Sequence, residues 1–178
     1  MKTQIQKIIG LLTISSLLFV SCETVDFGDE NLNPNSISKA NTGALITGAM
    51  RNIPGIVSNV DSGVLYAQHV SEITYNEESC YETIQWNFDS FYTGPLMDLQ
   101  TVINLNNSEN AADYSSSGSV GMQKGVAHLL KVYMMHVITD RWGAVPYSEA
   151  LQGVDNLKPA FDDQSAVYAG MLAEIDAA

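Results

Sequence analysis

Apolar residues recur at intervals of three and four along most of the chain after residue 36, which is the spacing of one face of an α-helix. The strongest pattern covers residues 119–140, where apolar side chains occupy most of the helix circumference. We therefore predict a helix there that is buried between neighbours. A last helix is expected after residues 162–163, because either aspartate can cap it.

Three weaker periodic segments predict helices over residues 36–52, 62–73 and 96–105. Ser36 can cap the first of these, and the Pro54-Gly55 pair should end it. The period fails from Tyr75 to Trp86, so we expect a loop there, with room for a short strand over residues 82–86. Connections are expected over residues 107–119 and 153–159. Because no segment carries a convincing run of strand pattern, the predicted fold class is all-α.

The N-terminus has the pattern of an export signal. Two lysines, Lys2 and Lys7, precede an apolar stretch over residues 8–20. This stretch is shorter than the roughly 20 residues that span a bilayer, and it fits the apolar region of a secretory signal peptide. It ends in Phe-Val-Ser-Cys, which looks like a bacterial lipobox with Cys22 as the lipidated residue. We predict a lipoprotein signal peptide over residues 1–21.

The chain that follows the signal is acidic. Residues 22–35 read as a lipidated acidic tether, and residues 36–178 as the helical domain. The whole chain has 8 basic against 20 acidic side chains, a net charge of −12, which argues against a nucleic-acid partner. Membrane attachment is therefore expected through acyl chains on Cys22. Cys80 is then the remaining thiol, and we expect it to be a small buried residue without a disulfide.

The residues that could carry catalysis or bind a metal do not form a recognisable set. His69, His128 and His136 lack the close spacing of metal ligands on one helix. Neither a phosphate-binding glycine loop nor a GxSxG nucleophile motif is present, and the adjacent acidic pairs do not suit a glycosidase. We predict a protein that is not an enzyme and has no cofactor and no metal.

Aromatic residues are concentrated in the irregular segment. Within the 18 residues from 75 to 92 the chain places Tyr75, Tyr81, Trp86, Phe88, Phe91 and Tyr92. Amides and carboxylates lie between them, and such a mixture suits a sugar, whose C–H faces stack on rings while its hydroxyls form hydrogen bonds. We predict ligand binding by Trp86, Tyr81, Tyr75 and Asn87. The alternative for the three aromatic residues among them is a place in the core or an interface. Phe88, Phe91 and Tyr92 are expected to join the core.

A second dense stretch, Asp-Arg-Trp-Gly-Ala-Val-Pro-Tyr-Ser-Glu-Ala over residues 140–150, follows the strongest helix, and we interpret it as a structural turn. Together with Lys-Pro-x-Phe-Asp-x-Gln over residues 158–164, it resembles the SusD/RagB family of outer-membrane nutrient-binding lipoproteins. The stretches over residues 93–99 and 48–52 are similar to one branch of that family. The resemblance covers the chain from the lipobox to the last helix.

This resemblance implies an all-α protein of tetratricopeptide-like helix pairs that form part of an α superhelix. It implies a lipoprotein of the outer membrane, anchored through Cys22 and exposed at the cell surface. Such a protein caps a SusC-type TonB-dependent transporter and delivers oligosaccharides to it without cleaving them. The family's members are longer and the last helix lacks a stop signal, so we expect residues 36–178 to be the N-terminal part of a larger protein.

Two alternatives stay open at this stage. One is a peptide-binding lid or protein-interaction scaffold of such a transporter, and the other is a truncated, non-functional fragment. Exposed coplanar rings over residues 75–92 would favour a glycan ligand. Rings packed inward beneath an apolar outer patch would favour a protein partner.

Overall fold

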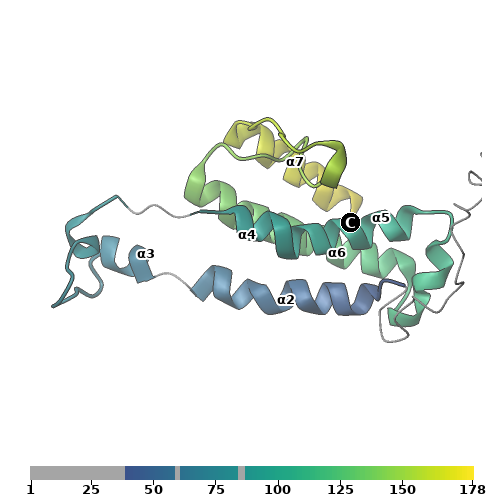
Figure 1. Cartoon of the computed structure of the whole chain (residues 1–178), viewed down its shortest axis with the longest axis horizontal. Coiled ribbons are helices and arrows are strands. Elements are labelled where there is room, and N and C mark those ends of the chain that lie inside the picture. The colour runs from purple at the N-terminus through teal and green to yellow at the C-terminus, as the bar shows by residue number, and fades with distance from the viewer. Residues whose placement is uncertain (1–38, 59–60, 84–86) are drawn as a thin grey trace, which may run out of the picture. The chain divides into compact units, whose positions relative to one another are not determined.

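The computed structural model describes residues 39–58, 61–83 and 87–178 (Figure 1). The predicted signal peptide, the lipidated Cys22, the tether, the Ser36 cap and Trp86 lie outside the described residues. The described residues form helices and turns and contain no strand; a single bridge joins Val145 to Asp162. The all-α prediction is confirmed.

The longer helices follow the predicted order. They are α2 (Thr42–Ser58), α3 (Asp61–Tyr66), α5 (Met97–Asn107), α6 (Val120–Trp142) and α7 (Gln164–Ala177). Shorter turns are η2 (Glu78–Cys80), α4 (Asp89–Phe91), the π-helical η3 (Tyr92–Leu96), η4 (Ala111–Ser117) and η5 (Gly153–Asp155). The last three helices lie close to the ranges expected from periodicity.

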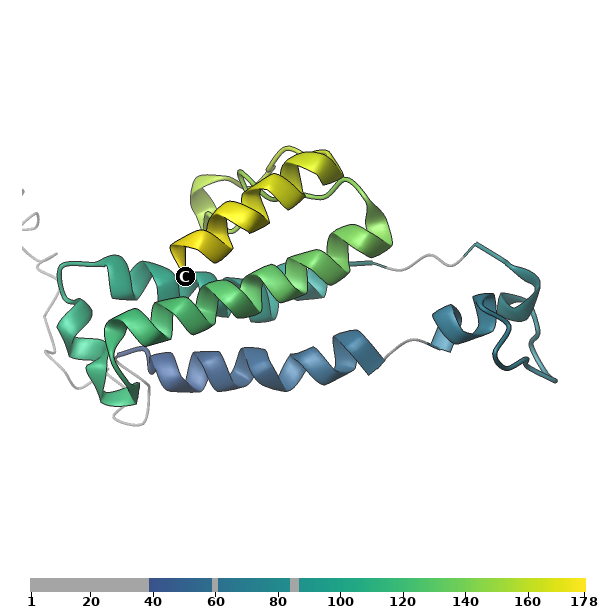
Figure 2. The ribbon, with the colours of Figure 1, turned by 180° about the vertical axis from the view of Figure 1, so that it is seen from behind.

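The helix α6 is the centre of the packing. It contacts α2, α5 and α7, and α2 also packs against α5. Figures 1 and 2 show that α5 and α6 run in opposite directions, as do α6 and α7. Helices α5, α6 and α7 therefore follow one another in antiparallel order, as expected.

One hydrophobic core joins these helices. Its buried members are Ala49, Leu96, Leu99, Val102, Ile103, Ala127, Met134, Met135, Ile138, Val145, Val167 and Met171. They come from α2, η3, α5, α6, α7 and the connection before α7, so the core depends on all of these elements. Burial of such side chains, at about 1.5–3 kcal/mol each, is the main force that holds the helices together.

Polar side chains define the start of α6 and the connection before it. The Ser119 hydroxyl accepts a hydrogen bond from the Met122 amide at 3.3 Å, as an N-cap should. Gln123 is buried, and its amide donates to the carbonyls of Tyr114 (2.8 Å) and Gly118 (2.7 Å). Its own oxygen accepts from Asn106 at 3.2 Å. These bonds fasten the connection between α5 and α6 to both helices.

The expected end of the first helix was wrong. Helix α2 continues through Pro54 and ends at Ser58. Proline removes the amide that would bond to the Met50 carbonyl, but both residues lie on the exposed side of α2, where water can bond to that carbonyl. At the other end, the Asn41 side chain accepts from the Ala44 amide at 3.0 Å and caps the helix.

The expected second helix was too long. Helix α3 ends at Tyr66, and Gln68 follows with a left-handed φ of 55°, a conformation that terminates helices. Ile73, which was expected to belong to this helix, is 99% exposed. Cys80 is also exposed rather than buried. Within residues 63–83, where side-chain exposure is described, only Leu65 is buried, so little apolar contact is available to extend α3.

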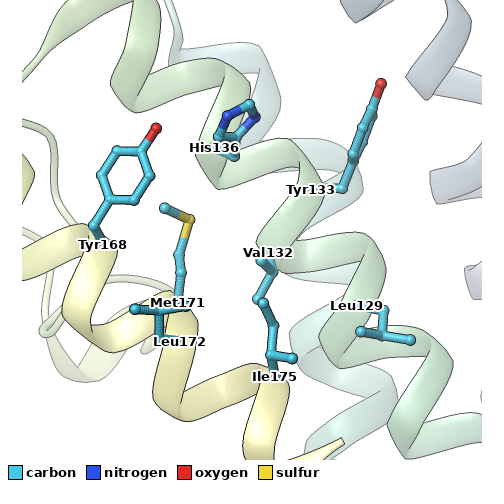
Figure 3. Close-up of a pocket in the computed structure, with 8 residues that line it drawn as sticks. All are labelled: Leu129, Val132, Tyr133, His136, Tyr168, Met171, Leu172 and Ile175. Carbon is cyan, nitrogen blue, oxygen red and sulfur yellow. The ribbon is translucent and has the colours of Figure 1, made fainter.

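Helix α6 is less buried than expected. Its Val126, Leu129 and Tyr133 are exposed, because α7 covers only part of this side of the helix. The two helices leave an apolar groove of about 390 Å³ (Figure 3). It is lined by Leu129, Val132, Tyr133, His136, Tyr168, Met171, Leu172 and Ile175. We call this the α6/α7 groove.

Candidate functional site

Two of the predicted ligand-binding tyrosines are displayed on the surface of an irregular segment. Tyr75 is 82% exposed and Tyr81 is 60% exposed. Both have left-handed backbones, with φ of 59° and 64°. This conformation costs a bulky residue about 1–2 kcal/mol and is concentrated at functional sites. The alternative for these two rings was a place in the core or an interface; their exposure contradicts the core, and the interface stays open.

Tyr66 contributes a third ring that the sequence analysis missed. Its centroid lies 5.8 Å from that of Tyr81, and the two ring planes are tilted by 38°. The Tyr66 hydroxyl donates to the Glu82 carbonyl, which ties the end of the segment back to α3. Tyr66 lay inside a predicted helix, and no sequence signal set it apart. Tyr66 and Tyr81 are exposed but tilted to one another, so this pair is not the coplanar arrangement that was expected to favour a glycan.

Hydrogen bonds keep the rest of this segment folded on itself. The Glu72 amide donates to the Ser79 hydroxyl at 3.0 Å, and the Glu82 amide donates to the Glu77 carbonyl at 3.0 Å. A small pocket of about 300 Å³ lies beside Ser79, lined by Leu65, Gln68, His69, Val70, Ser71 and Ser79. Hydroxyl, amide and imidazole groups therefore lie in the same segment as the exposed tyrosines.

Asn87 is exposed, and both ends of its amide are engaged locally. Its oxygen accepts from the Asp89 amide at 2.6 Å, and its nitrogen donates to the Asp89 carboxylate at 2.8 Å. This Asx turn starts α4. Trp86 lies outside the described residues, so its place relative to Asn87 is not described. The ligand-binding role of both residues stays a prediction.

The remaining aromatic residues of the segment belong to the core, as expected. Phe88, Phe91 and Tyr92 are partly buried against it. Phe88 and Phe91 lie against Trp142, with centroid distances of 5.6 and 6.1 Å. The Tyr92 hydroxyl donates to the Pro146 carbonyl at 2.6 Å, and burial with the nearby Asp162 charge raises the pKa of Tyr92.

Asp162 organises the turn after Trp142. Its carboxylate accepts from the amides of Tyr147 (3.0 Å) and Ser148 (2.8 Å), and from the Ser148 hydroxyl at 2.8 Å. The Ser148 amide and hydroxyl bonds, more than offsetting slight desolvation, lower the pKa of Asp162. Asp163, rather than Asp162, stands at the N-cap position of α7, without a side-chain cap bond. The structural interpretation of residues 140–150 agrees with this geometry.

A second carboxylate, Glu174 of α7, links three elements. It accepts from His128 (2.8 Å) and Lys131 (2.8 Å) of α6 and from the Tyr147 hydroxyl (2.9 Å). Burial by itself raises the pKa of Glu174, but the hydrogen bond and charge of Lys131, with the bonds from His128 and Tyr147, lower it overall. We call these four residues the Glu174 network. Sequence reasoning missed it.

The structure assigns the histidines separate surroundings. His128 belongs to the Glu174 network, whereas His136 lies 3.2 Å from the Asp140 carboxylate, which also accepts from the Tyr168 hydroxyl at 2.7 Å. Across the described ranges, no three side chains of His, Cys, Asp or Glu gather as metal ligands would. In the same part of the chain, no helix combines the length and apolar character needed to cross a bilayer.

These features define a class of protein. A helical scaffold carries exposed tyrosines on an irregular segment, beside hydroxyl, amide and carboxylate groups. This arrangement is typical of ligand-binding proteins. The chain belongs to the SusD-like family: residues 34–178 match its family model, described as "Starch-binding associating with outer membrane". Among curated proteins, none matches the chain.

Proposed function

We propose that this protein is a non-catalytic oligosaccharide-binding lipoprotein of the outer-membrane surface, which delivers its ligand to a SusC-type TonB-dependent transporter. Membership of a family described as starch-binding and associated with the outer membrane supports the ligand class and the location. The observation that carries the proposal on this chain is the exposure of Tyr75 and Tyr81 at left-handed positions. A folded chain keeps bulky rings in such positions when they have a use outside the core.

The exposed rings give sugar binding a physical basis. An exposed tyrosine face can stack on the C–H face of a pyranose, and the neighbouring polar side chains can bond its hydroxyls. Tyr75, Tyr81, Trp86 and Asn87 are the proposed binding residues. A few rings and hydrogen bonds of about 1 kcal/mol each support weak affinity, so we expect tight capture to depend on the transporter complex.

Calorimetric titration of the full chain in detergent with maltoheptaose tests this proposal. Tyr75→Ala and Tyr81→Ala should each weaken binding by about tenfold, a loss of about 1.4 kcal/mol. Tyr133→Ala is the matched control, because Tyr133 is an exposed tyrosine on α6. Maltoheptaose affinity that is undiminished in the double variant of Tyr75 and Tyr81 would contradict the proposed site. Absence of binding by the folded parent to any of a panel of plant and host oligosaccharides would contradict the ligand class.

Tryptophan fluorescence gives an independent reading of the Trp86 role. The chain has two tryptophans, and Trp142 packs against Phe88 and Phe91 in the core. A ligand-dependent change in the parent that disappears in Trp86→Ala, while the Trp142 signal stays native, is the expected result. An unchanged response in Trp86→Ala would remove Trp86 from the site.

The anchor is tested separately from the ligand. Metabolic labelling with palmitate should mark the wild-type chain and not Cys22→Ala. The variant should no longer be found in the outer-membrane fraction. Cys80→Ala is the matched control, because Cys80 is the other cysteine and is exposed. Labelling that persists in Cys22→Ala would contradict a lipid anchor at this position. Co-purification of a TonB-dependent transporter with the wild-type chain tests the partner.

A transporter lid or protein-interaction scaffold is the second candidate, and the α6/α7 groove favours it. Apolar side chains exposed together are typical of contacts with other proteins. If maltoheptaose and other oligosaccharides fail to bind while the transporter co-purifies, this second function would replace the first.

A further inference from the structure

A polar pocket of about 580 Å³ lies between α5, α6 and the connection that follows Trp142. It is lined by Met97, Gln100, Asn104, Lys131, Tyr147, Ser148, Ala150, Leu151, Gln152, Gly153 and Asp155. None of these residues belongs to the segment over residues 61–92 that carries the proposed tyrosine site. Its volume falls within the range of about 300–1,000 Å³ that is typical of small-molecule sites.

Several polar groups of this pocket have no partner among the described residues. The Asn104 oxygen accepts from Gln100 at 2.9 Å, and its nitrogen is left free to donate. The side chains of Gln152 and Asp155 make no hydrogen bond or ion pair within the described chain. Leu151, which also lines the pocket, has a left-handed φ of 62°, a strained conformation of the kind found at ligand sites.

Two residues of the Glu174 network, Lys131 and Tyr147, line this pocket, and the network fixes the position of this lysine. The Lys131 ammonium bonds to Glu174 at 2.8 Å and to the Gln100 oxygen at 3.0 Å. It also lies 5.9 Å from the centre of the Tyr147 ring, within the range of a cation–π contact. Two of the three N–H groups of the Lys131 ammonium are thereby used. Because the ammonium is already held in place, the third N–H can bond to a ligand without further loss of side-chain freedom.

The chemistry of the lining selects against anions. Glu174 compensates the charge of Lys131, which leaves the exposed Asp155 carboxylate as the uncompensated charge of the lining. Amides, an ammonium and a carboxylate together offer both donors and acceptors, and hydroxyl groups need both. Met97, Ala150 and Leu151 add apolar surface for C–H groups.

We propose that this pocket is a second binding site, which takes a neutral mono- or disaccharide independently of the exposed tyrosines. Asn104 and Gln152 bond to hydroxyls through their amides, Asp155 accepts from a hydroxyl, and Met97 contacts the ring. The inference goes beyond the proposed function, because its residues and its ligand size differ from those of the tyrosine site.

Methyl NMR of the full chain in detergent, with labelled methionine, tests the site. Met97 lines this pocket and Met171 lines the α6/α7 groove, so the two methyl groups report on different places. Titration with maltose should shift the Met97 signal saturably and leave Met171 unchanged. Glucuronate, whose carboxylate Asp155 repels, should bind more weakly than maltose, and the cationic glucosamine should bind no more tightly than maltose.

Variants of exposed residues keep the test independent of folding. Asn104→Ala and Gln152→Ala should each weaken maltose binding by about fivefold, and Asp155→Asn by about tenfold, as expected for neutral and charged hydrogen bonds. Asn107→Ala is the matched control, because Asn107 is an exposed amide on the same helix that does not line the pocket. It should leave binding unchanged.

The remaining outcomes each support or overturn the proposed second site. An unshifted Met97 signal up to the solubility limit of maltose would overturn the site, and tighter binding of either charged sugar would overturn the ligand class. The double variant Tyr75→Ala/Tyr81→Ala separates this inference from the proposed function. If it abolishes the Met97 shift, the pocket is not an independent site; if the shift persists, the pocket binds by itself whatever the tyrosines do.

Discussion

Glu174 shows how a single side chain can join residues that are far apart in the sequence. It bonds to residues 46 and 27 positions earlier in the chain, His128 and Tyr147, as well as to Lys131. The carboxylate and the two α6 side chains are all largely covered, with exposures of 9%, 16% and 15%. At this depth each polar group needs its partner, because an unpaired one loses its hydration without compensation.

Glu174→Gln should therefore lower the free energy of unfolding by about 2 kcal/mol, since the amide cannot neutralise Lys131. Chemical denaturation at neutral pH measures this. The parent should lose the same stabilisation in acid: the pKa of Glu174 is lowered in the folded state, so its contribution is complete above the unfolded pKa and disappears as the pH falls through the folded value. Asp176→Asn on the same helix is the control. Equal stability of the two variants would contradict the role of the network.

Gly170 is a second position where one side chain decides the local packing. A Cβ at this position would contact the Tyr147 ring, whose Cδ1 and Cζ atoms would lie 3.1 Å away. Alanine in place of a helical glycine gains about 1 kcal/mol, whereas forcing an aromatic ring out of position costs about 1–3 kcal/mol. The packing cost is the larger effect, because the displaced ring also loses its bond to Glu174.

Gly170→Ala should accordingly lower the Tm. Gly121→Ala should raise it, because no atom lies within 4 Å of a Cβ placed at Gly121 in α6. Thermal unfolding followed by circular dichroism compares the two variants. A higher Tm for Gly170→Ala would show that Tyr147 can move without loss.

At the scale of elements, the connection from Gly143 to Asp163 is held by polar contacts. Asp162 gathers the amides of Tyr147 and Ser148, and its backbone pairs with Val145 in both directions, at 3.0 and 3.2 Å. The pKa of Asp162 is lowered chiefly by the bonds from Ser148. Its stabilisation is thus complete above the ordinary pKa of 3.8 and is lost as the pH falls through the lowered folded value.

Asp162→Ala should reduce the free energy of unfolding at neutral pH by about 1–2 kcal/mol, the usual effect of losing a carboxylate that accepts backbone amides. The difference from the parent should shrink as the pH falls below 4. Denaturation across pH 2–7 measures both effects. The adjacent Asp163→Asn, which lacks a side-chain cap bond, should change stability little; a loss equal to that of Asp162→Ala would contradict the assignment.

The success of sequence reasoning varied with the kind of element. Helices α5, α6 and α7 were predicted well because their buried residues recur with the helical period. The continuation through Pro54 and the early end of α3 depend on which side of a helix meets solvent, which periodicity does not specify. The packing of Phe88, Phe91 and Tyr92 against the core was predicted. For Tyr75 and Tyr81 the sequence left exposure and burial open, and the structure shows them exposed.

The Glu174 network and the polar pocket were not predictable by the same reasoning. Both depend on contacts between α5, α6, α7 and the connection before α7, whose residues lie far apart in the sequence. A lysine, an amide and a glutamate on three helices carry no shared local pattern. Their partnership exists only once the helices are packed.

At the scale of the whole molecule, the α6/α7 groove leaves apolar side chains of both helices uncovered. Helix α6 was predicted to be buried between neighbours, yet its Leu129 is 51% exposed, and Leu172 of α7 is 63% exposed. Exposed apolar side chains of this kind promote association between molecules. The effect belongs to the molecule rather than to either helix, because α6 and α7 each supply one side of the groove (Figure 3).

Leu172→Lys should therefore reduce concentration-dependent self-association of the purified chain while changing the Tm little, since an exposed side chain contributes little to the core. Sedimentation velocity over a range of protein concentrations measures association. Ala173→Lys, at a neighbouring exposed position outside the groove, is the control. Identical sedimentation of parent and Leu172→Lys would contradict a role of the groove in association.

At Tyr75 and Tyr81, whose backbones are left-handed, thermal stability and sugar binding favour different residues. Glycine at position 75 or 81 would relieve about 1 kcal/mol of backbone strain at each site, so a search for hardier variants would favour it. The same replacement would delete the ring proposed to hold the sugar. Directed evolution that selects for thermal stability alone should therefore replace these tyrosines and lose oligosaccharide binding. Selection for both stability and oligosaccharide binding should keep aromatic residues at positions 75 and 81.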